Sequence, residues 1–183
     1  YKQRTSAQLN QQRSIPGFLV QELWSKVISG DHPSGRIAMQ ATTLNGFTRA
    51  QLVEFHKTRY VPDNAAIAIA GDISYADASK LVESRLGGWK KAGTPAPTAS
   101  DPAPAGAARV SLVDRPNSVQ TNFVVGTQAI SRVDADYDAL QLMNAVVGGG
   151  PTGRLFTHLR EEKGYTYGAY SGLSAGRYKG TWL

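Results

Sequence analysis

Two hydrogen-bond donors late in the chain, Arg160 and Tyr167, have the side chains best suited to chemistry on a peptide. Arg160 lies near the end of a predicted helix, Gly164 turns the chain, and Tyr167 follows on a predicted strand. A guanidinium and a phenol that point to one place can hold a peptide carbonyl and stabilise an oxyanion. From the residues alone a structural interpretation is favoured, in which Arg160 complements the helix C-terminus and Tyr167 packs in a sheet.

The other residues that carry metal or acid–base chemistry form no recognisable pattern. His32 precedes a proline in a turn, and His56 and His158 lie on separate predicted helices. None stands in an HExxH, HxxEH or HxH setting, and the chain has no cysteine to supply a thiolate or a disulfide. Glu161 and Glu162 are neighbours, so they do not share a helix face. We therefore predict no metal site in this chain.

The glycine-rich stretch GGGPTGR resembles a phosphate-binding loop only superficially. Gly148 and Gly153 have the Walker spacing, but Arg154 and Leu155 stand where Lys and Ser/Thr are needed. Leu155 has no hydroxyl to hold magnesium. A phosphate loop also follows a strand, whereas this stretch follows a predicted helix. The pattern indicates a flexible loop that leads into the next helix.

Composition and charge exclude several classes of function. The chain has 183 residues, of which 41% are hydrophobic and 19% charged, as in a globular protein. No apolar run approaches the ~20 residues of a membrane helix. The net charge of +6 comes from scattered Lys and Arg, so nucleic-acid binding is not indicated, although a weak attraction to acidic peptides is compatible with it. The first residue is Tyr1 with no targeting segment, and we expect a fragment of a longer protein.

The hydrophobic pattern mixes helices and strands in both halves of the chain. Predicted helices cover 1–29 with a break at Pro16-Gly17, 48–60 after a Thr48 cap, 74–89 after Ser74, 138–147 and 154–164. Predicted strands cover 65–71, 108–114, 118–129 and 165–183. Because strands and helices do not alternate regularly, we predict an α+β fold.

One segment differs in kind from the rest. Residues 91–108 are dominated by Pro, Ala, Gly, Ser and Thr, with no apolar period, which is typical of an extended linker. The linker divides the chain into a first part, 1–90, and a second part, 109–183.

A longer stretch carries a family resemblance. Residues 148–171, GGGPTGRLFTHLREEKGYTYGAYS, resemble the glycine loop, helix and strand of the second domain of pitrilysin/insulinase-family zinc peptidases, the HxxEH inverzincins. Segments 31–36, 47–73 and 118–150 resemble other parts of the same family in the same order. The resemblance implies tandem processing-peptidase-like α/β sandwich domains that face each other across a chamber. The chain would hold the end of the first domain, 1–90, and the start of the second, from 109.

The resemblance also implies functional roles in the second domain. Arg160 and Tyr167 match the arginine and tyrosine that contact the substrate carbonyl in this family. Gly148, Gly149 and Gly150 match the glycine-rich loop that some members, such as the mitochondrial processing peptidase, use near the substrate.

The family's zinc site is only partly represented. Members usually have HxxEH in the first domain, followed later by a glutamate ligand. The stretch AQLNQQRSIP matches that later segment and puts Gln8 where the zinc-ligand glutamate should be. An amide is a poor zinc ligand compared with a carboxylate. The resemblance therefore implies that zinc is held upstream or on a partner chain, and that this chain has no cofactor of its own.

These features lead to a hypothesis with two alternatives. The resemblance implies a non-catalytic subunit of a zinc-dependent metallopeptidase, whose homologous zinc-bearing partner activates water and pairs the peptide substrate with a sheet edge. The parent could instead be a scaffolding relative, or a conventional zinc peptidase whose HxxEH lies before Tyr1. In each case we expect this chain to be inactive alone. The lack of cysteine and the Ala/Pro-rich linker favour the periplasm over the cytoplasm.

Overall fold

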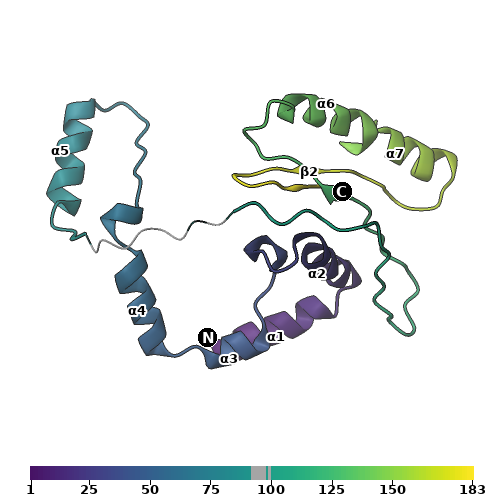
Figure 1. The fold of residues 1–183 in the computed structure, drawn as a ribbon, viewed down its shortest axis with the longest axis horizontal. Helices are drawn as coiled ribbons and strands as arrows, with labels where there is room; N and C mark the ends of the chain where they lie inside the picture. Colours follow the sequence, from purple (N-terminus) through teal and green to yellow (C-terminus); the bar gives the residue numbers. More distant parts are fainter. Residues whose placement is uncertain (92–97, 99) are drawn as a thin grey trace. The chain divides into compact units, whose positions relative to one another are not determined.

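The structure is a computed structural model that describes residues 1–91, 98 and 100–183. It is helix-rich with one small sheet, which confirms the predicted α+β class (Figure 1). The described residues form two compact units, Tyr1–Ala41 with Ser100–Leu183, and Thr42–Ala99. These units are defined by contacts within the chain and do not test the predicted domains. The domains 1–90 and 109–183 stay a prediction. Of the predicted linker, residues 92–97 and 99 lie outside the described residues.

The first unit begins with two helices and ends with further helices followed by a β-hairpin. Its elements in chain order are α1 (Lys2–Arg13), α2 (Pro16–Ser29), η1 (Pro33–Gly35), β1 (Thr127–Gln128), α6 (Tyr137–Gly148), α7 (Arg154–Phe156), η3 (Thr157–Glu162), β2 (Leu173–Ser174) and β3 (Thr181–Trp182). The break between α1 and α2 confirms the one predicted at Pro16, whose missing N–H is tolerated in the first turn of a helix. Arg13 bridges the break by an ion pair with Glu22 at 2.8 Å, which raises the pKa of the Arg13 guanidinium.

The sheet of this unit is antiparallel, with the strand order β1-β3-β2. Trp182 of β3 pairs with Thr127 on one side and Leu173 on the other. Trp182 also fixes the sheet to α6, because its indole N–H donates to Asn144 Oδ1 at 2.9 Å. In Figure 1, α6 and α7 follow one another along the β2–β3 hairpin. This layer positions the segment that carries Arg160 and Tyr167.

The strands are much shorter than the sequence predicts. The predicted strand 108–114 pairs with no other strand among the described residues, and 118–129 does so only at its end. Val110 and Val119 are 89% and 98% exposed. A strand gains stability from neighbours on its edges and faces rather than from its own sequence, and these segments lack both.

The second unit is built from helices and one extended segment. Its elements are α3 (Ala41–Gly46), α4 (Arg49–Arg59), η2 (Pro62–Asn64) and α5 (Tyr75–Leu86). The predicted caps are confirmed. Thr48 and Gln51 form a capping box, and Ser74 accepts from the Asp77 N–H at 3.1 Å. The predicted buried strand 65–71 is wrong for this structure, because it pairs with no described strand and Ile67 is 52% exposed.

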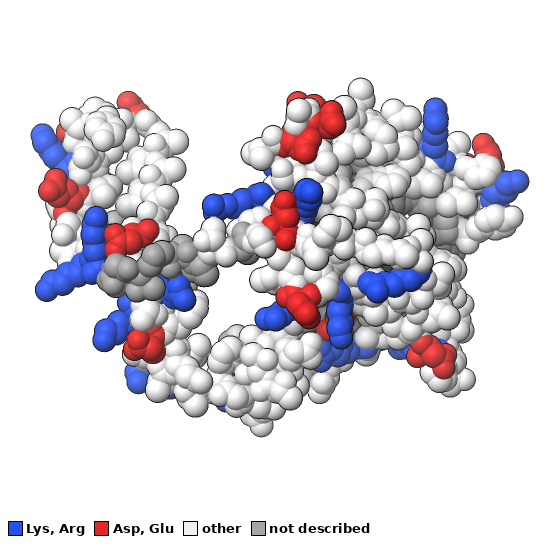
Figure 2. All heavy atoms as spheres, viewed as in Figure 1, with Lys and Arg blue, Asp and Glu red and all other residues white. Residues whose placement is uncertain are grey.

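Few apolar side chains are buried in either unit. Among the described residues these are Leu9, Ile28, Leu44 and Val61. No helix in the described part of the chain combines the length and the apolar character needed to cross a bilayer. On the face shown in Figure 2, basic and acidic side chains are interspersed rather than gathered by sign.

Candidate functional site

Arg160 lies on a helix that changes its winding. The helix starts as α7 and continues as η3, a π-helical segment in which Lys163 N–H donates to the His158 carbonyl, five residues back, at 3.1 Å. The predicted helix over 154–164 is confirmed, but its π character was not predicted. Single π turns are rare and are found frequently at functional sites. Arg160 therefore stands on an unusual stretch of backbone.

A left-handed residue then turns the chain back toward Arg160. Gly164 has a φ of 64°, a conformation that glycine adopts without strain. Its N–H donates to the Arg160 carbonyl at 3.2 Å, and Tyr165 N–H donates to the Leu159 carbonyl at 3.0 Å. These bonds end the helix, and Tyr167 follows two residues later.

The turn brings Arg160 and Tyr167 together. The guanidinium carbon of Arg160 lies 5.3 Å from the centroid of the Tyr167 ring, within the range of a cation–π contact. Both residues are exposed, Tyr167 to 85%, and Tyr167 lies outside the three-stranded sheet. Within the described part of the chain, neither side chain makes a hydrogen bond or an ion pair. The donors of both groups thus remain available to a ligand.

Close backbone packing holds the chain around Ser171 against the end of α6. The Gly148 carbonyl accepts from the Ser171 N–H at 2.8 Å. A Cβ on Gly148 would lie 2.6 Å from that nitrogen, and a Cβ on Gly153 would lie 2.9 Å from the Gly148 Cα. Only glycine fits such contacts. A Cβ on Gly150 would meet nothing within 4 Å, so one glycine of the loop faces open space.

Gly149 completes the loop, and a Cβ there would lie 2.8 Å from the Ala145 Cα. Two further features of this region were missed by the sequence interpretation. Phe156 and Tyr170 place their ring centroids 5.6 Å apart, joining α7 to the segment that leads to β2. The Ser171 hydroxyl is buried with no hydrogen-bond partner among the described residues. The Tyr-rich composition of 165–170 was the signal available for the ring contact.

A second arginine–tyrosine pair was also missed. Arg132 lies over the Tyr137 ring at 4.4 Å, and its guanidinium also donates to the Tyr137 hydroxyl at 2.9 Å. Gln141 donates to the same hydroxyl at 2.8 Å. This pair is closed, because its arginine donates to its own tyrosine, whereas the pair of Arg160 and Tyr167 is open.

The predicted position of the missing zinc ligand lies on α1. Gln8 is exposed, and no group of three His, Cys, Asp or Glu residues that could hold a metal occurs in the part of the chain described here. His158 is bonded to Glu162 at 2.7 Å, and His56 stacks on Tyr60 at 4.9 Å. The residues present therefore do not fit a zinc ion.

His32 is hydrogen-bonded within the protein through both ring nitrogens. Its Nδ1 lies 2.7 Å from Ser34 Oγ and its Nε2 lies 2.8 Å from the Ser100 carbonyl oxygen. These contacts tie the turn after α2 to a segment far along the chain. His32, like the other two histidines, thus has partners within the protein.

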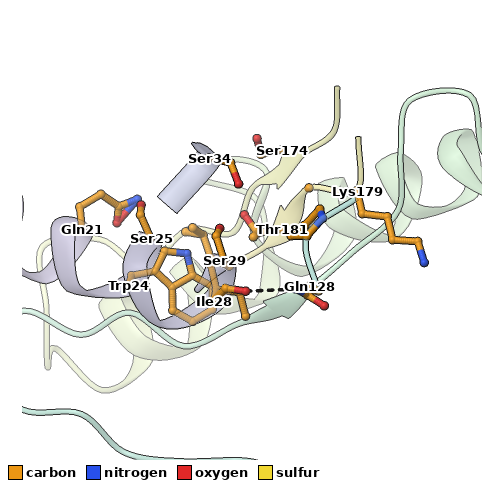
Figure 3. A pocket seen from close by; sticks show the side chains of 13 residues that line it. Gln21, Trp24, Ser25, Ile28, Ser29, Ser34, Gln128, Ser174, Lys179 and Thr181 are labelled. Atoms are coloured by element: carbon orange, nitrogen blue, oxygen red, sulfur yellow. Dashed lines mark hydrogen bonds between the residues drawn. The ribbon is translucent and has the colours of Figure 1, made fainter. Parts of the chain in front are cut away.

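A cavity of about 240 Å³ lies between α2 and the sheet, apart from Arg160 and Tyr167 (Figure 3). Trp24 and Ile28 supply apolar surface, and Gln128 spans from the sheet to the Ile28 carbonyl at 3.0 Å. In Figure 3 the Lys179 side chain runs away from the other labelled side chains. The cavity does not include either member of the open pair.

Comparison with known proteins identifies the family. Residues 46–183, more than half of the chain, match the model described as the peptidase M16 inactive domain. The chain belongs to the peptidase M16 family. This finding confirms the predicted resemblance to pitrilysin/insulinase-type peptidases.

Relatives within the M16 family agree. The chain is 32% identical over 161 residues to an uncharacterized zinc protease of Mycobacterium tuberculosis, covering 86% of this chain and 36% of that protein. A zinc protease of Streptomyces coelicolor is 31% identical over 165 residues, covering 85% and 35%. The chain thus spans about a third of the length of these curated relatives.

The fold is shared with a solved structure. A peptidase M16 inactive domain from Pseudomonas fluorescens superposes with a TM-score of 0.80 and 29% identity, covering 99% of this chain and 44% of that chain. The family model, over residues 46–183, and this structure, over 99% of the chain, both carry the description of an M16 inactive domain.

Proposed function

We propose that this chain is the substrate-binding part of an M16-family zinc-dependent peptidase, and that Arg160 and Tyr167 hold a carbonyl group of the peptide. The observation that supports this role most strongly is the open pair itself. Two exposed donors lie next to each other, and neither is bonded to another described residue. The pair of Arg132 and Tyr137 differs, because an Arg132 N–H donates to its own tyrosine hydroxyl.

The two side chains have different roles, because one is a cation and the other a neutral phenol. The face of the Tyr167 ring contacts the Arg160 guanidinium. This contact leaves the guanidinium N–H groups free to donate to a carbonyl oxygen. The Tyr167 hydroxyl is a second donor. Donors held in place before the reaction stabilise negative charge that develops on an oxygen, and they stabilise it more strongly than they bind the neutral carbonyl.

We further propose that the chain acts as the non-catalytic subunit beside a homologous, zinc-bearing partner. The exposed amide of Gln8 and the lack of a fitting ligand set in the described residues support a metal held outside this chain. In the family, zinc supplies the chemistry that activates water, and the residues of this chain would bind and orient the peptide. The periplasmic location belongs to the same proposal.

One observation favours a second candidate. The relatives named as zinc proteases are about three times as long as the part matched here, since the chain covers 36% of one of them. In a conventional zinc peptidase, the HxxEH motif would lie in the same polypeptide, and Arg160 and Tyr167 would keep the same role. The two candidates differ only in which chain holds the metal.

The proposal is tested in the full-length protein isolated with any partner that copurifies. We expect Arg160→Ala and Tyr167→Phe each to lower kcat/KM for peptide hydrolysis by about 100-fold, the scale on which one oxyanion donor acts. Zinc content, measured by metal analysis, should stay unchanged. Arg132→Ala serves as the matched control. Unchanged turnover in both test variants would contradict the proposal and favour a scaffolding role.

A further inference from the structure

The arginines of this chain differ in what their N–H groups bond to. Arg13 donates to the Glu22 carboxylate through Nε at 3.4 Å and through a terminal nitrogen at 2.8 Å. Arg132 donates to the Tyr137 hydroxyl. Arg160 has only its contact with an aromatic ring, and its donors are unused within the described residues. The exposed donors of Arg160 are therefore open to a ligand that supplies acceptors for them.

A guanidinium presents its donors as a planar fork. The fork matches the two oxygens of a carboxylate, and such bidentate, charge-assisted contacts are among the strong hydrogen bonds of proteins. A backbone carbonyl has one oxygen and no net charge, so it uses the fork only in part. The Arg13–Glu22 pair shows two-point contact with a carboxylate within this chain.

The acidic residues next to Arg160 do not neutralise it. Glu162 accepts from His158 Nδ1 at 2.7 Å and is directed to that partner. Glu161 follows Arg160 directly and points to another side of the helix. None of the ion pairs among the described residues includes Arg160. Arg160 is therefore an exposed cation with no acidic partner among the described residues. The chain as a whole also carries a net charge of +6.

We infer that the substrate of this site is an acidic peptide. A carboxylate, from an Asp or Glu side chain or from the peptide C-terminus, docks on the N–H groups of Arg160 that the carbonyl held by Arg160 and Tyr167 leaves unused. The inference rests on the proposed function and specifies the substrate class of the same site. It also predicts that binding weakens as salt rises, because the contact is exposed and charged.

The test uses the full-length protein, with its partner, and four peptides that share one scissile bond. One pair differs by Glu against Gln near that bond, and the other by a free acid against an amide at the C-terminus. In the wild type, we expect about a tenfold higher kcat/KM for one acid form over its neutral match. The pair that shows the preference identifies the source of the carboxylate.

Variants of Arg160 separate this inference from the proposed function. Arg160→Gln should abolish the acid preference, and Arg160→Lys should keep part of it, because lysine retains the charge without the fork. A uniform loss on all four peptides would leave the carbonyl role standing and overturn the inference. No loss on any peptide would overturn the proposed function as well. Arg132→Gln, with thermal denaturation of every variant, controls for folding.

Discussion

Two of the arginine–tyrosine pairs among the described residues differ in how their donors are used. In the pair of Arg132 and Tyr137, the cation lies 4.4 Å from the ring centroid and also donates to the phenol oxygen. In the pair of Arg160 and Tyr167, the distance is 5.3 Å, and no hydrogen bond joins the two side chains. In the first pair a donor of the arginine is used within the pair, whereas in the second no donor is bonded to another described residue.

The difference follows from the backbone that carries each pair. Arg132 precedes α6, and Tyr137 is the first residue of that helix, so one short turn holds both. Arg160 and Tyr167 are separated by the end of a π-helical segment and a left-handed glycine. The open pair thus depends on a longer, glycine-dependent scaffold, and variants of that scaffold should disturb it selectively.

The largest effect on stability is expected at Gly148. In Gly148→Ala the new methyl would lie 2.6 Å from the Ser171 backbone nitrogen and 2.8 Å from Leu155. Overpacking of this kind costs about 1–3 kcal/mol in the free energy of unfolding, which chemical denaturation measures. We also expect loss of hydrolysis, because Ser171 and α7 hold the open pair. Gly150→Ala is the control for stability and should change the free energy of unfolding little, since a Cβ there meets nothing within 4 Å.

A smaller effect is expected at Gly164. In Gly164→Ala, the residue must keep a φ of 64°, which costs an L-residue about 1–2 kcal/mol. Because Tyr167 follows this turn, kcat/KM should fall while the closed pair at the start of α6 is unaffected. The two effects are read from denaturation and from peptide hydrolysis. Full activity in this variant would show that the turn does not position Tyr167.

Sequence reasoning succeeded where structure is local. The Thr48 and Ser74 caps and the break at Pro16 are confirmed, because each depends on residues within one helical turn. The close approach of Arg160 and Tyr167 agrees with the expected turn at Gly164. Their role in binding substrate stays a prediction.

Sequence reasoning failed where structure depends on distant partners. Residues 65–71 form a short apolar run, as in a buried strand, yet they pair with no strand among those described. Such a run becomes a strand only where a neighbouring strand offers an edge. The π turn at Arg160 was also missed, because five-residue hydrogen bonds leave no simple spacing in the sequence. The closed pair also has no signature in the sequence, because Arg132 lies before the predicted helix and meets Tyr137 only through the turn that leads into α6.

The central claim is that the pair of Arg160 and Tyr167 serves hydrolysis, whereas the pair of Arg132 and Tyr137 serves stability. One double-mutant cycle on each pair tests this claim most directly. Arg160→Ala, Tyr167→Phe and their double variant are compared with Arg132→Ala, Tyr137→Phe and theirs, in kcat/KM and in the free energy of unfolding. The account predicts coupling in kcat/KM alone for the open pair. For the closed pair it predicts coupling in stability alone, with Tyr137→Phe costing about 1 kcal/mol. Coupling of Arg160 and Tyr167 in stability, with additive or absent effects on hydrolysis, would contradict it.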